Sequence, residues 1–240
     1  NVYSMDGGRL IHTGGTKYST EQETYNKITA NGNTGNGPAW FRVESKNGMI
    51  FEYGNTSDSK FHNQLQNGII ASWYLSKVTD NQGNYYTYHY RLENDQVLLE
   101  EIKYGGNNSA GVQPYNEVKF IYNDRQDKNT TDVAGQSMKQ SVVLSQIKVR
   151  SEGVLVRKYI LKYGYSLYTY LTEIKELGSD QSALNSTIFK YGTPSAGILE
   201  ESATYTKQVS PGIGQSYWPG DYDGDGKTDL LSFNYSLYNG

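Results

Sequence analysis

The sequence lacks cysteine, long apolar runs and clusters of Lys or Arg among its 240 residues. Without cysteine, the fold can contain neither a disulfide bond nor a thiol nucleophile. No segment approaches the roughly 20 apolar residues that a membrane-spanning helix needs, and no signal peptide is visible. We therefore expect no membrane span in this part of the polypeptide.

The charge balance is also unremarkable in sign and in distribution. Lys and Arg total 22 against 25 Asp and Glu, which gives a formal net charge of -3. Since no basic run marks a surface for a polyanion, we expect no nucleic-acid partner. The chain begins with Asn1 and stops at Gly240 directly after a strand-like stretch, so we expect it to be a fragment of a longer protein.

The composition favours β-structure. The chain has 23 tyrosines and 26 glycines, with many Asn and Thr, little alanine and no long apolar stripe at helical spacing. Tyr and Thr favour strands, whereas Gly and Asn favour turns. The sequence therefore predicts an all-β fold.

Two turns indicate how the strands are connected. Asn47-Gly48 lies between the strand-like segments 40–43 and 49–53, and Asn-Gly tolerates the positive φ angles of a tight hairpin turn. A second hairpin is expected with its turn at residues 80–84. Both patterns predict antiparallel neighbours, and hence an antiparallel β-hairpin meander.

A short unit, Leu-x-x-Ile-Lys, recurs along the chain. It begins at Leu99, Leu144 and Leu171, with a looser copy at Leu75. Each strict copy precedes a turn and then a strand that ends in aromatic residues. Such repetition indicates an array in which each hairpin buries its apolar face against its neighbours, although coincidence in a chain rich in Tyr and Leu is the alternative.

Tyrosines also gather on one predicted strand. Tyr86, Tyr88 and Tyr90 share one face at alternate positions. Such a row can pack against a neighbouring layer, or it can form a flat platform for sugars or peptides. We favour packing, and keep an adhesion or carbohydrate-binding module that uses this face as the alternative function.

One loop has the pattern of a calcium site. In WPGDYDGDGKTDLLSF, carboxylates or a backbone carbonyl fall at alternate positions of a glycine-containing loop: Asp221, Asp223, Asp225, Lys227 and Asp229. Calcium takes six to eight oxygen ligands, and a lysine at the seventh position is no objection because that position supplies only a backbone carbonyl. We predict Ca²⁺ at these five residues, with an unoccupied acidic turn as the alternative.

The flanks of this loop differ from those of an EF-hand. The twelfth position is Ser232 rather than Glu, and Pro219 blocks a helix entering the loop. We therefore expect the loop to join two strands. A saturated oxygen cage has no open coordination position for a nucleophile, so the predicted metal is structural and not catalytic.

No catalytic constellation is visible. His12, His62 and His89 lie far apart, and neither a Gly-x-Ser-x-Gly elbow nor a Walker phosphate loop occurs. The adjacent acids at 100–101 and 200–201 point to opposite faces of a strand. We predict no enzyme and no catalytic residue, although a glycosidase-like pair of acids from different strands stays open.

Residues 193–216 lose the strand alternation and carry Pro194 and Pro211. We interpret this stretch as a linker. The predicted domains are then a β-domain at 1–192, the linker at 193–216, and an incomplete calcium-loop repeat at 217–240.

Nine stretches resemble, in their order, the Salmonella virulence-plasmid B protein family, which shares this region with insecticidal toxin-complex B components and RHS/YD-repeat proteins. They cover most of residues 1–192: YSMDGGRLI, FRVESKNGMIFEYGNT, ASWYLSKVTDNQGNYYTYHY, LLEEIKYGG, VKFIYNDRQD, LSQIKV, RKYILKYGYS, LTEIKEL and STIFKYG. The loop PGDYDGDGKTDLL in turn resembles the calcium loop of FG-GAP/VCBS repeats, which build β-propellers. The resemblance implies an RHS-like shell sheet followed by a partial FG-GAP propeller blade.

The resemblance also implies a function. In toxin-complex B components this region forms part of a hollow β-shell that holds a toxic C-terminal polypeptide, and the propeller docks the shell onto a translocation pore. We therefore expect a non-catalytic structural module of a secreted or cell-surface bacterial toxin-like protein. Its expected partners are the remainder of the same polypeptide, with its propeller and RHS shell, and a toxin-complex pore component. The chain lacks the cysteine pair that some members carry near ELGSDQSALNSTIF.

Overall fold

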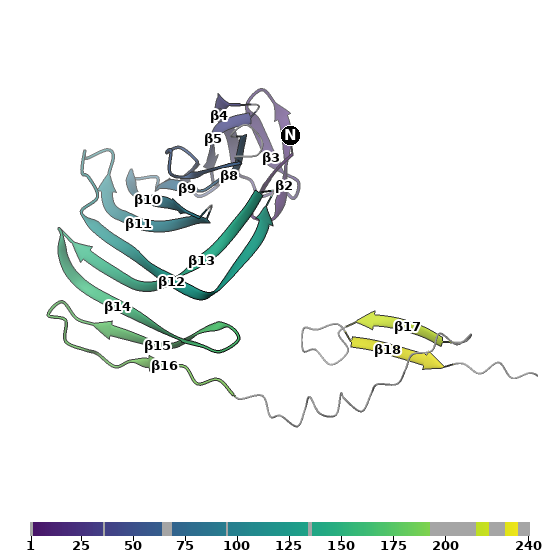
Figure 1. The fold of residues 1–240 in the computed structure, drawn as a ribbon. Coiled ribbons are helices and arrows are strands. Elements are labelled where there is room, and N and C mark those ends of the chain that lie inside the picture. Colours follow the sequence, from purple (N-terminus) through teal and green to yellow (C-terminus); the bar gives the residue numbers. More distant parts are fainter. Residues whose placement is uncertain are drawn as a thin grey trace, which may run out of the picture. The chain divides into compact units, whose positions relative to one another are not determined.

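The structure is a computed structural model that is described in seven segments of the chain. These are residues 2–35, 37–63, 69–94, 96–133, 136–192, 215–220 and 229–234. The chain divides into two units, Asn1–Lys190 and Tyr191–Gly240, which we take separately. All the regular secondary structure in the described segments consists of β-strands (Figure 1), so the predicted all-β fold is confirmed. None of the described residues forms a helix that could cross a membrane.

The strands of the first unit range in length from 2 to 18 residues. Their bounds are β1 Tyr3–Met5, β2 Gly8–Gly14, β3 Lys17–Thr20, β4 Lys27–Thr34, β5 Gly37–Glu44, β6 Ile50–Tyr53, β7 Lys60–Asn63, β8 Ile69–Trp73, β9 Leu75–Thr79, β10 Asn84–Glu93, β11 Gln96–Asn107, β12 Asn116–Val133, β13 Gln136–Ser151, β14 Val154–Tyr165, β15 Thr169–Leu177 and β16 Thr187–Ile188.

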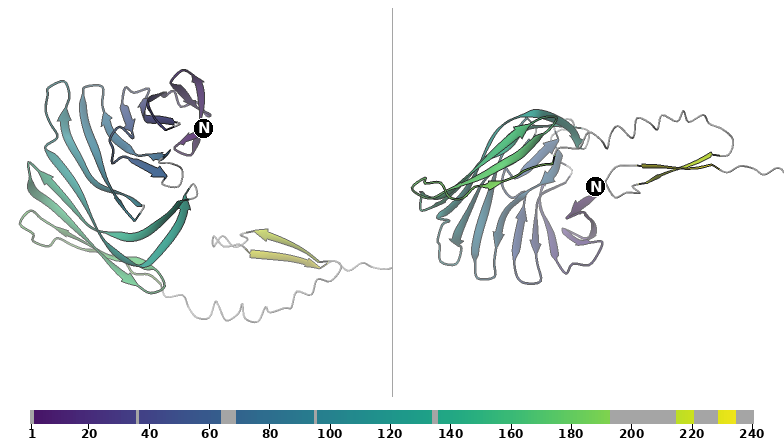
Figure 2. Two further views of the ribbon diagram at one scale, coloured as in Figure 1. Left: turned by 45° about the horizontal axis from the view of Figure 1, so that its top comes forward. Right: turned by 90° about the horizontal axis from the view of Figure 1, so that it is seen from below.

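All of these strands except β7 and β8 form one 14-stranded sheet, in which every neighbour is antiparallel. The strand order follows the sequence except that β6 pairs with β9, because β7 and β8 form a separate hairpin. Figures 1 and 2 show that this sheet is curved, with β9 to β15 lying side by side. The predicted antiparallel meander is therefore confirmed.

Both predicted hairpin turns are present. At the turn between β5 and β6, the amide of Ser45 donates to the carbonyl of Met49, and Gly48 has a φ of 83°. Between β9 and β10, the Asp80 carboxylate accepts hydrogen bonds from the backbone amides of Gln82 and Asn84 at 2.9 and 2.8 Å. These contacts stabilise turns that the Asn-Gly and Asp-Asn patterns predict.

The two faces of the sheet differ in chemistry. Directly paired ion pairs line one face, with Nζ or Nη1 to Oε distances of 3.3 Å for Lys27–Glu44, 2.6 Å for Arg150–Glu117 and 2.7 Å for Lys162–Glu173. Successive side chains alternate between the faces, so the residues between these pairs point to the other face. That other face carries apolar residues and, at β14 and β15, the Arg157–Glu176 ion pair.

A second layer covers the apolar face near the N-terminus. The core there consists of Leu10, Ile28, Ala30, Phe41 and Val43, with side chains from β1 and β8 packed against it. Trp73 of β8 meets Phe41 edge to face with ring centroids 5.1 Å apart, and its indole N–H donates to the Pro38 carbonyl at 3.2 Å. Burial and edge-to-face contacts together stabilise this part of the sheet.

The same face is only half-buried further along the sheet. Val118, Phe120, Ile147 and Tyr159, from β12 to β14, are intermediate in exposure. Their register places them together, since Val118 pairs with Val149 and Phe120 with Ile147, which in turn pairs with Tyr159. The apolar face from β12 to β14 is thus a half-exposed surface, and it ends at β15 beside the Arg157–Glu176 ion pair.

The second unit contains one described hairpin. Strand β17 spans Gln215–Gly220 and β18 spans Asp229–Asn234, and they pair antiparallel from Gln215–Asn234 to Gly220–Asp229. The prediction that the aspartate loop joins two strands is confirmed by this pairing. The domain bounds 1–192, 193–216 and 217–240 stay a prediction.

Candidate functional site: the tyrosine ladder

The predicted calcium ligands lie almost entirely outside the described residues. Asp221, Asp223, Asp225 and Lys227 fall between the two strands of the second unit, and only the backbone of Asp229 is described, as the first residue of β18. The donor set nevertheless fits calcium, because four carboxylates within one strand-to-strand connection suit a hard cation. The metal site stays a prediction.

Histidines and acids of the described residues do not form a metal centre. No group of three or more His, Asp or Glu side chains in these segments could hold a metal ion. His12 bonds to the Gly15 carbonyl through Nε2 at 2.8 Å, within its own turn. His89 lies 3.8 Å from Asp58, with Nδ1 toward Oδ2. Both imidazole rings thus contact groups of the fold itself.

A repeated β-bulge runs across the sheet. In four pairs of neighbouring strands, the register shifts by one residue where a tyrosine on one strand meets a leucine on the other. The pairs are Tyr53–Leu75, Tyr90–Leu99, Tyr122–Leu144 and Tyr163–Leu171. Each leucine is the first residue of a Leu-x-x-Ile-Lys unit or its looser copy, so the sequence repeat corresponds to a structural one. We call these eight residues the tyrosine ladder.

The residue after each ladder leucine is the extra residue of the bulge. In three bulges it carries a hydroxyl that donates to the carbonyl of the residue just before the tyrosine: Ser76 to Glu52 at 2.8 Å, Ser145 to Ile121 at 2.9 Å and Thr172 to Lys162 at 3.0 Å. A bulge disrupts the ladder of backbone hydrogen bonds, and these hydroxyls restore a partner to one carbonyl.

The bulge at Tyr90–Leu99, between β10 and β11, has no such hydroxyl. Its extra residue is Glu100, which has no hydroxyl. There the Asp58 carboxylate accepts a hydrogen bond from the backbone amide of Tyr90 at 2.9 Å. An acceptor from the connection between β6 and β7 therefore supports this bulge in place of a hydroxyl group.

The tyrosine hydroxyls link one bulge to the next. Three of the four donate to the carbonyl of the ladder leucine in the preceding pair: Tyr90 to Leu75 at 2.8 Å, Tyr122 to Leu99 at 2.7 Å and Tyr163 to Leu144 at 2.6 Å. Burial raises the pKa of all three phenols, which keeps them protonated as donors. The ladder thus runs without interruption from β6 to β15.

Sequence reasoning finds the leucines of this ladder but not its bonds. The Leu-x-x-Ile-Lys repeat locates each bulge, yet nothing in it predicts a register shift. The available indication is the residue after leucine, which is Ser or Thr at positions 76, 145 and 172. Small hydroxyl residues inside an apolar strand are a mark of side-chain bonding to backbone.

A second polar cluster fixes the bend of β12. Between Asp124 and Asn129 the register with β13 shifts widely. Within that bulge, Nε and Nη2 of Arg125 bond both carboxylate oxygens of Asp127 at 2.9 Å. Asp127 also accepts from the amide of Thr169 at 2.8 Å and from its hydroxyl. The cluster therefore ties β12 to the first residue of β15.

The hydrogen bonds of this cluster favour the charged form of the Asp127 carboxylate. The Arg125 guanidinium, and then the Thr169 donors, hold the pKa of Asp127 well below its usual range. The side chains of Arg125 and Asp127 are 15% and 12% exposed. A bidentate pair with two further donors is among the stronger polar contacts in proteins. Its sequence, Arg-Gln-Asp within a strand, gives no indication of this role.

The tyrosine row on β10 favours packing over a binding platform. The rings of Tyr86 and Tyr88 meet edge to face with centroids 5.8 Å apart, and both side chains are half-buried. Tyr90 belongs to the ladder and donates to a backbone carbonyl. None of these contacts leaves a flat, open aromatic surface of the kind that sugars stack on.

Comparisons with known proteins agree with this architecture. The family model described as Salmonella virulence plasmid 65kDa B protein, SpvB, matches residues 16–148. No curated protein matches the chain.

Solved structures share the fold at low sequence identity. The N-terminal domain of effector protein SpvB from Salmonella typhimurium strain LT2 has a TM-score of 0.63 and 16% identity, covering 72% of this chain and 79% of that one. A TcdB2-TccC3 crystal structure has a TM-score of 0.64 and 16% identity over 96% of this chain. A Photorhabdus luminescens Tc holotoxin pore structure has 0.63 and 15% over 92%.

The chain spans only 15% of the TcdB2-TccC3 chain and 13% of the Tc holotoxin chain. These likenesses therefore concern the fold of one region of much larger proteins. The family model, by contrast, matches more than half of the sequence. The chain belongs to the family of the Salmonella virulence plasmid 65kDa B protein, SpvB.

Proposed function

We propose that this chain is a non-catalytic wall segment of a β-shell that encloses or presents a C-terminal effector in a bacterial toxin-like protein. The observation that carries the proposal is the half-exposed apolar face of β12 to β14 on a curved, continuously paired sheet. A charged face and an apolar face on one sheet suit a wall between solvent and an enclosed polypeptide.

The tyrosine ladder supports this function because it stabilises a sheet without requiring a second layer. A single sheet normally needs packing against another element to be stable. Here phenol-to-carbonyl bonds join alternate strand pairs. Each buried bond contributes about 1 kcal/mol, so the array helps to offset missing cover on the apolar face.

The partners and the location follow from the relatives. The Photorhabdus luminescens Tc holotoxin pore structure is a toxin assembly by its name. By analogy, the partners of this chain are the remainder of its polypeptide and a toxin-complex pore component, and its site of action is outside the producing bacterium. Calcium bound at Asp221, Asp223, Asp225, Lys227 and Asp229 would hold the connection between β17 and β18 as part of an FG-GAP blade.

The test uses adjacent residues on opposite faces of β13. In the full-length protein that carries this chain, Ile147→Glu places a charge on the apolar face, whereas Lys148→Glu changes the charged face. We expect the effector to become sensitive to added protease in the Ile147 variant and to stay protected in the Lys148 variant, with both variants keeping wild-type circular dichroism.

Two outcomes would contradict the proposal. Equal digestion of the effector in the wild type and in a variant lacking residues 1–192 would show that this region encloses nothing. Turnover of a substrate by the purified chain, abolished by a point substitution within it, would show that it is an enzyme.

A further inference from the structure

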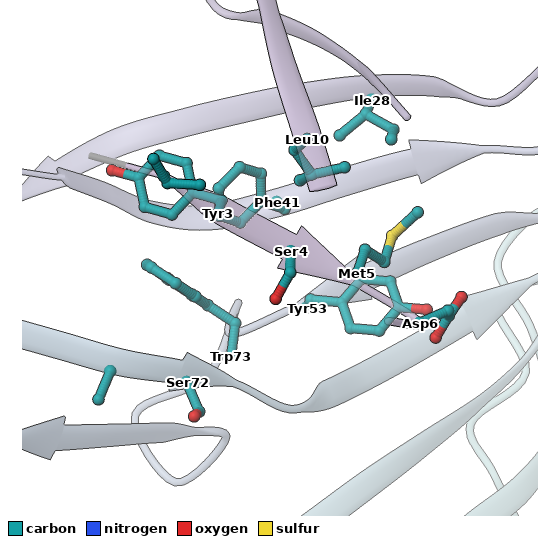
Figure 3. Close-up of a pocket in the computed structure, with 12 residues that line it drawn as sticks. Tyr3, Ser4, Met5, Asp6, Leu10, Ile28, Phe41, Tyr53, Ser72 and Trp73 are labelled. Carbon is teal, nitrogen blue, oxygen red and sulfur yellow. The ribbon is translucent and has the colours of Figure 1, made fainter. Parts of the chain in front are cut away.

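A cavity lies beside two strand edges in the N-terminal part of the sheet. It has a volume of about 340 Å³, within the lower range of ligand pockets. Figure 3 shows β1 crossing between the strands that carry Leu10 and Phe41 on one side and the strand that carries Ser72 and Trp73 on the other. The cavity is thus bounded by β1, by the core and by β8.

The lining residues show that the cavity lies along strand edges. It touches consecutive residues 2–6 at β1 and 71–73 at β8. Successive side chains of a strand point to opposite faces, so a cavity that contacts all of them must run beside the backbone. Among described strands, β1 pairs with β2 and β8 with β7, and neither has a strand partner on its other edge.

The turn after β1 sets which backbone groups point toward that edge. Asp6 and Gly7, with φ angles of 50° and 78°, form the two-residue turn of the β1–β2 hairpin. In such a hairpin the flanking residues, Met5 and Gly8, are the hydrogen-bonded pair, and the next pair directs its amides and carbonyls away from one another. The N–H and C=O of Ser4 therefore point away from β2.

The floor of the cavity is apolar, its walls carry polar side chains, and one charge lies at its end. Leu10, Ile28 and Phe41 of the core form its floor, and Asp6 is the one charged residue of its lining. Burial, and secondarily the charge of Asp6, raise the pKa of Tyr53 in the same wall. The carboxylate of Asp6 therefore acts on the cavity electrostatically.

We propose that this cavity is a strand-acceptor site, in which an extended peptide segment pairs antiparallel with the outer edge of β1. Strand addition uses backbone hydrogen bonds for affinity and alternate side-chain pockets for specificity. A peptide that pairs antiparallel with β1 has its first residue beside the end of β1, where Asp6 lies. Because the Asp6 carboxylate attracts a positive charge, this first residue of the peptide is basic. Its following residues alternate, with small β-branched apolar side chains over the Leu10, Ile28 and Phe41 floor.

The experiment uses a defined peptide and the 240-residue chain. The probe is the peptide acetyl-Lys-Val-Thr-Val-Thr, with fluorescein attached through an amide at its C-terminus. Its binding is measured by fluorescence polarisation. We expect saturable binding, and we expect amide hydrogen exchange at Ser4 to slow at least tenfold when the peptide is present. Protection at Ser4 reports backbone pairing, which contact through side chains alone would not produce.

Asp6→Asn is the informative variant because Asn tolerates the positive φ that this turn requires. We expect it to weaken peptide binding at least fivefold, whereas Asp124→Asn, at a carboxylate 80% exposed on β12, leaves binding unchanged. Ala71→Phe fills the cavity and is expected to abolish binding, with the melting temperature as the check on folding.

Three outcomes would overturn the proposal. The first is the absence of saturable binding by the peptide. The second is equal binding by a peptide of the same sequence with N-methylated backbone amides, which cannot donate to a strand edge. The third is binding without slower exchange at Ser4, which would indicate that the cavity takes an apolar side chain and not a strand.

Discussion

Three tyrosines of the ladder, Tyr90, Tyr122 and Tyr163, contribute through two parts of their side chains. The ring covers apolar neighbours on the half-buried face, and the hydroxyl donates to a leucine carbonyl at a bulge, as Tyr122 does to Leu99 at 2.7 Å. A buried carbonyl without a partner costs more than a hydrogen bond contributes. At the residue scale, the hydroxyl therefore contributes to stability in addition to the ring.

Replacing Tyr122 with Phe removes this hydroxyl and little else. We expect Tyr122→Phe to lower the free energy of unfolding by about 1 kcal/mol, because the Leu99 carbonyl loses its donor. Urea denaturation followed by circular dichroism measures the change. Tyr115→Phe, at a side chain that is 50% exposed, is the control and should change stability by less than about 0.5 kcal/mol. Equal effects of the two substitutions would contradict the role of the hydroxyl.

The Asp127 cluster makes stability depend on pH at the acid end. Arg125 and Thr169 lower the pKa of Asp127 in the folded chain. The stabilisation is therefore complete above the ordinary Asp pKa and is lost as the pH falls toward the depressed value. We expect the wild-type melting temperature to fall between roughly pH 5 and pH 2 more steeply than that of Asp127→Asn. Asp124→Asn is the exposed control, and an unchanged slope in Asp127→Asn would refute the assignment.

At the scale of elements, the sequence predicts the hairpins better than the bulges. Asn47-Gly48 and the Asp80 turn dictate local φ angles, so their hairpins follow from the chain itself. The bulge at Ser145 depends instead on which residue of β12 faces it, and that register is set by packing across strands. The repeat of leucines identifies where the ladder lies, but only the paired strands reveal its bonds.

The connection between β6 and β7 packs closely against β8 at Gly54. Gly54 has a φ of 74°, and a Cβ added there would lie 2.4 Å from Cδ1 of Trp73. We expect Gly54→Ala to destabilise the fold by about 2 kcal/mol or more, through both strain and overpacking.

Gly153→Ala provides a matched control for this prediction. Gly153 has a φ of 81°, and a Cβ added there would meet nothing within 4 Å. The substitution therefore reports the cost of the backbone conformation alone, about 1 kcal/mol. If the two alanine variants melted at the same temperature, close packing of Trp73 against Gly54 would be refuted.

At the scale of the whole chain, the fold class and strand order are predictable because alternation and turn residues are local properties. Which part of the apolar face is covered is not predictable in this way. Trp73 and Tyr3 cover Phe41, whereas Phe120 stays half-exposed, although all four are aromatic strand residues. The difference arises from the β7–β8 hairpin and from β1, whose positions depend on contacts distant in sequence.

The aspartate loop of the second unit gives the last prediction. Four carboxylates between Gly220 and the end of the loop repel one another unless a cation binds, and the pairing of Gly220 with Asp229 brings the loop ends together. We expect Ca²⁺ to bind the full-length protein with a Kd of about 10⁻⁴ to 10⁻³ M, as in extracellular modules. Isothermal titration calorimetry should show this binding lost in Asp223→Ala and retained in Asp124→Ala. Because a bound ion stabilises the state that binds it, Ca²⁺ should also raise the melting temperature of the wild type and not that of Asp223→Ala. Indistinguishable titrations of these two proteins would show that the loop is an acidic turn without a metal.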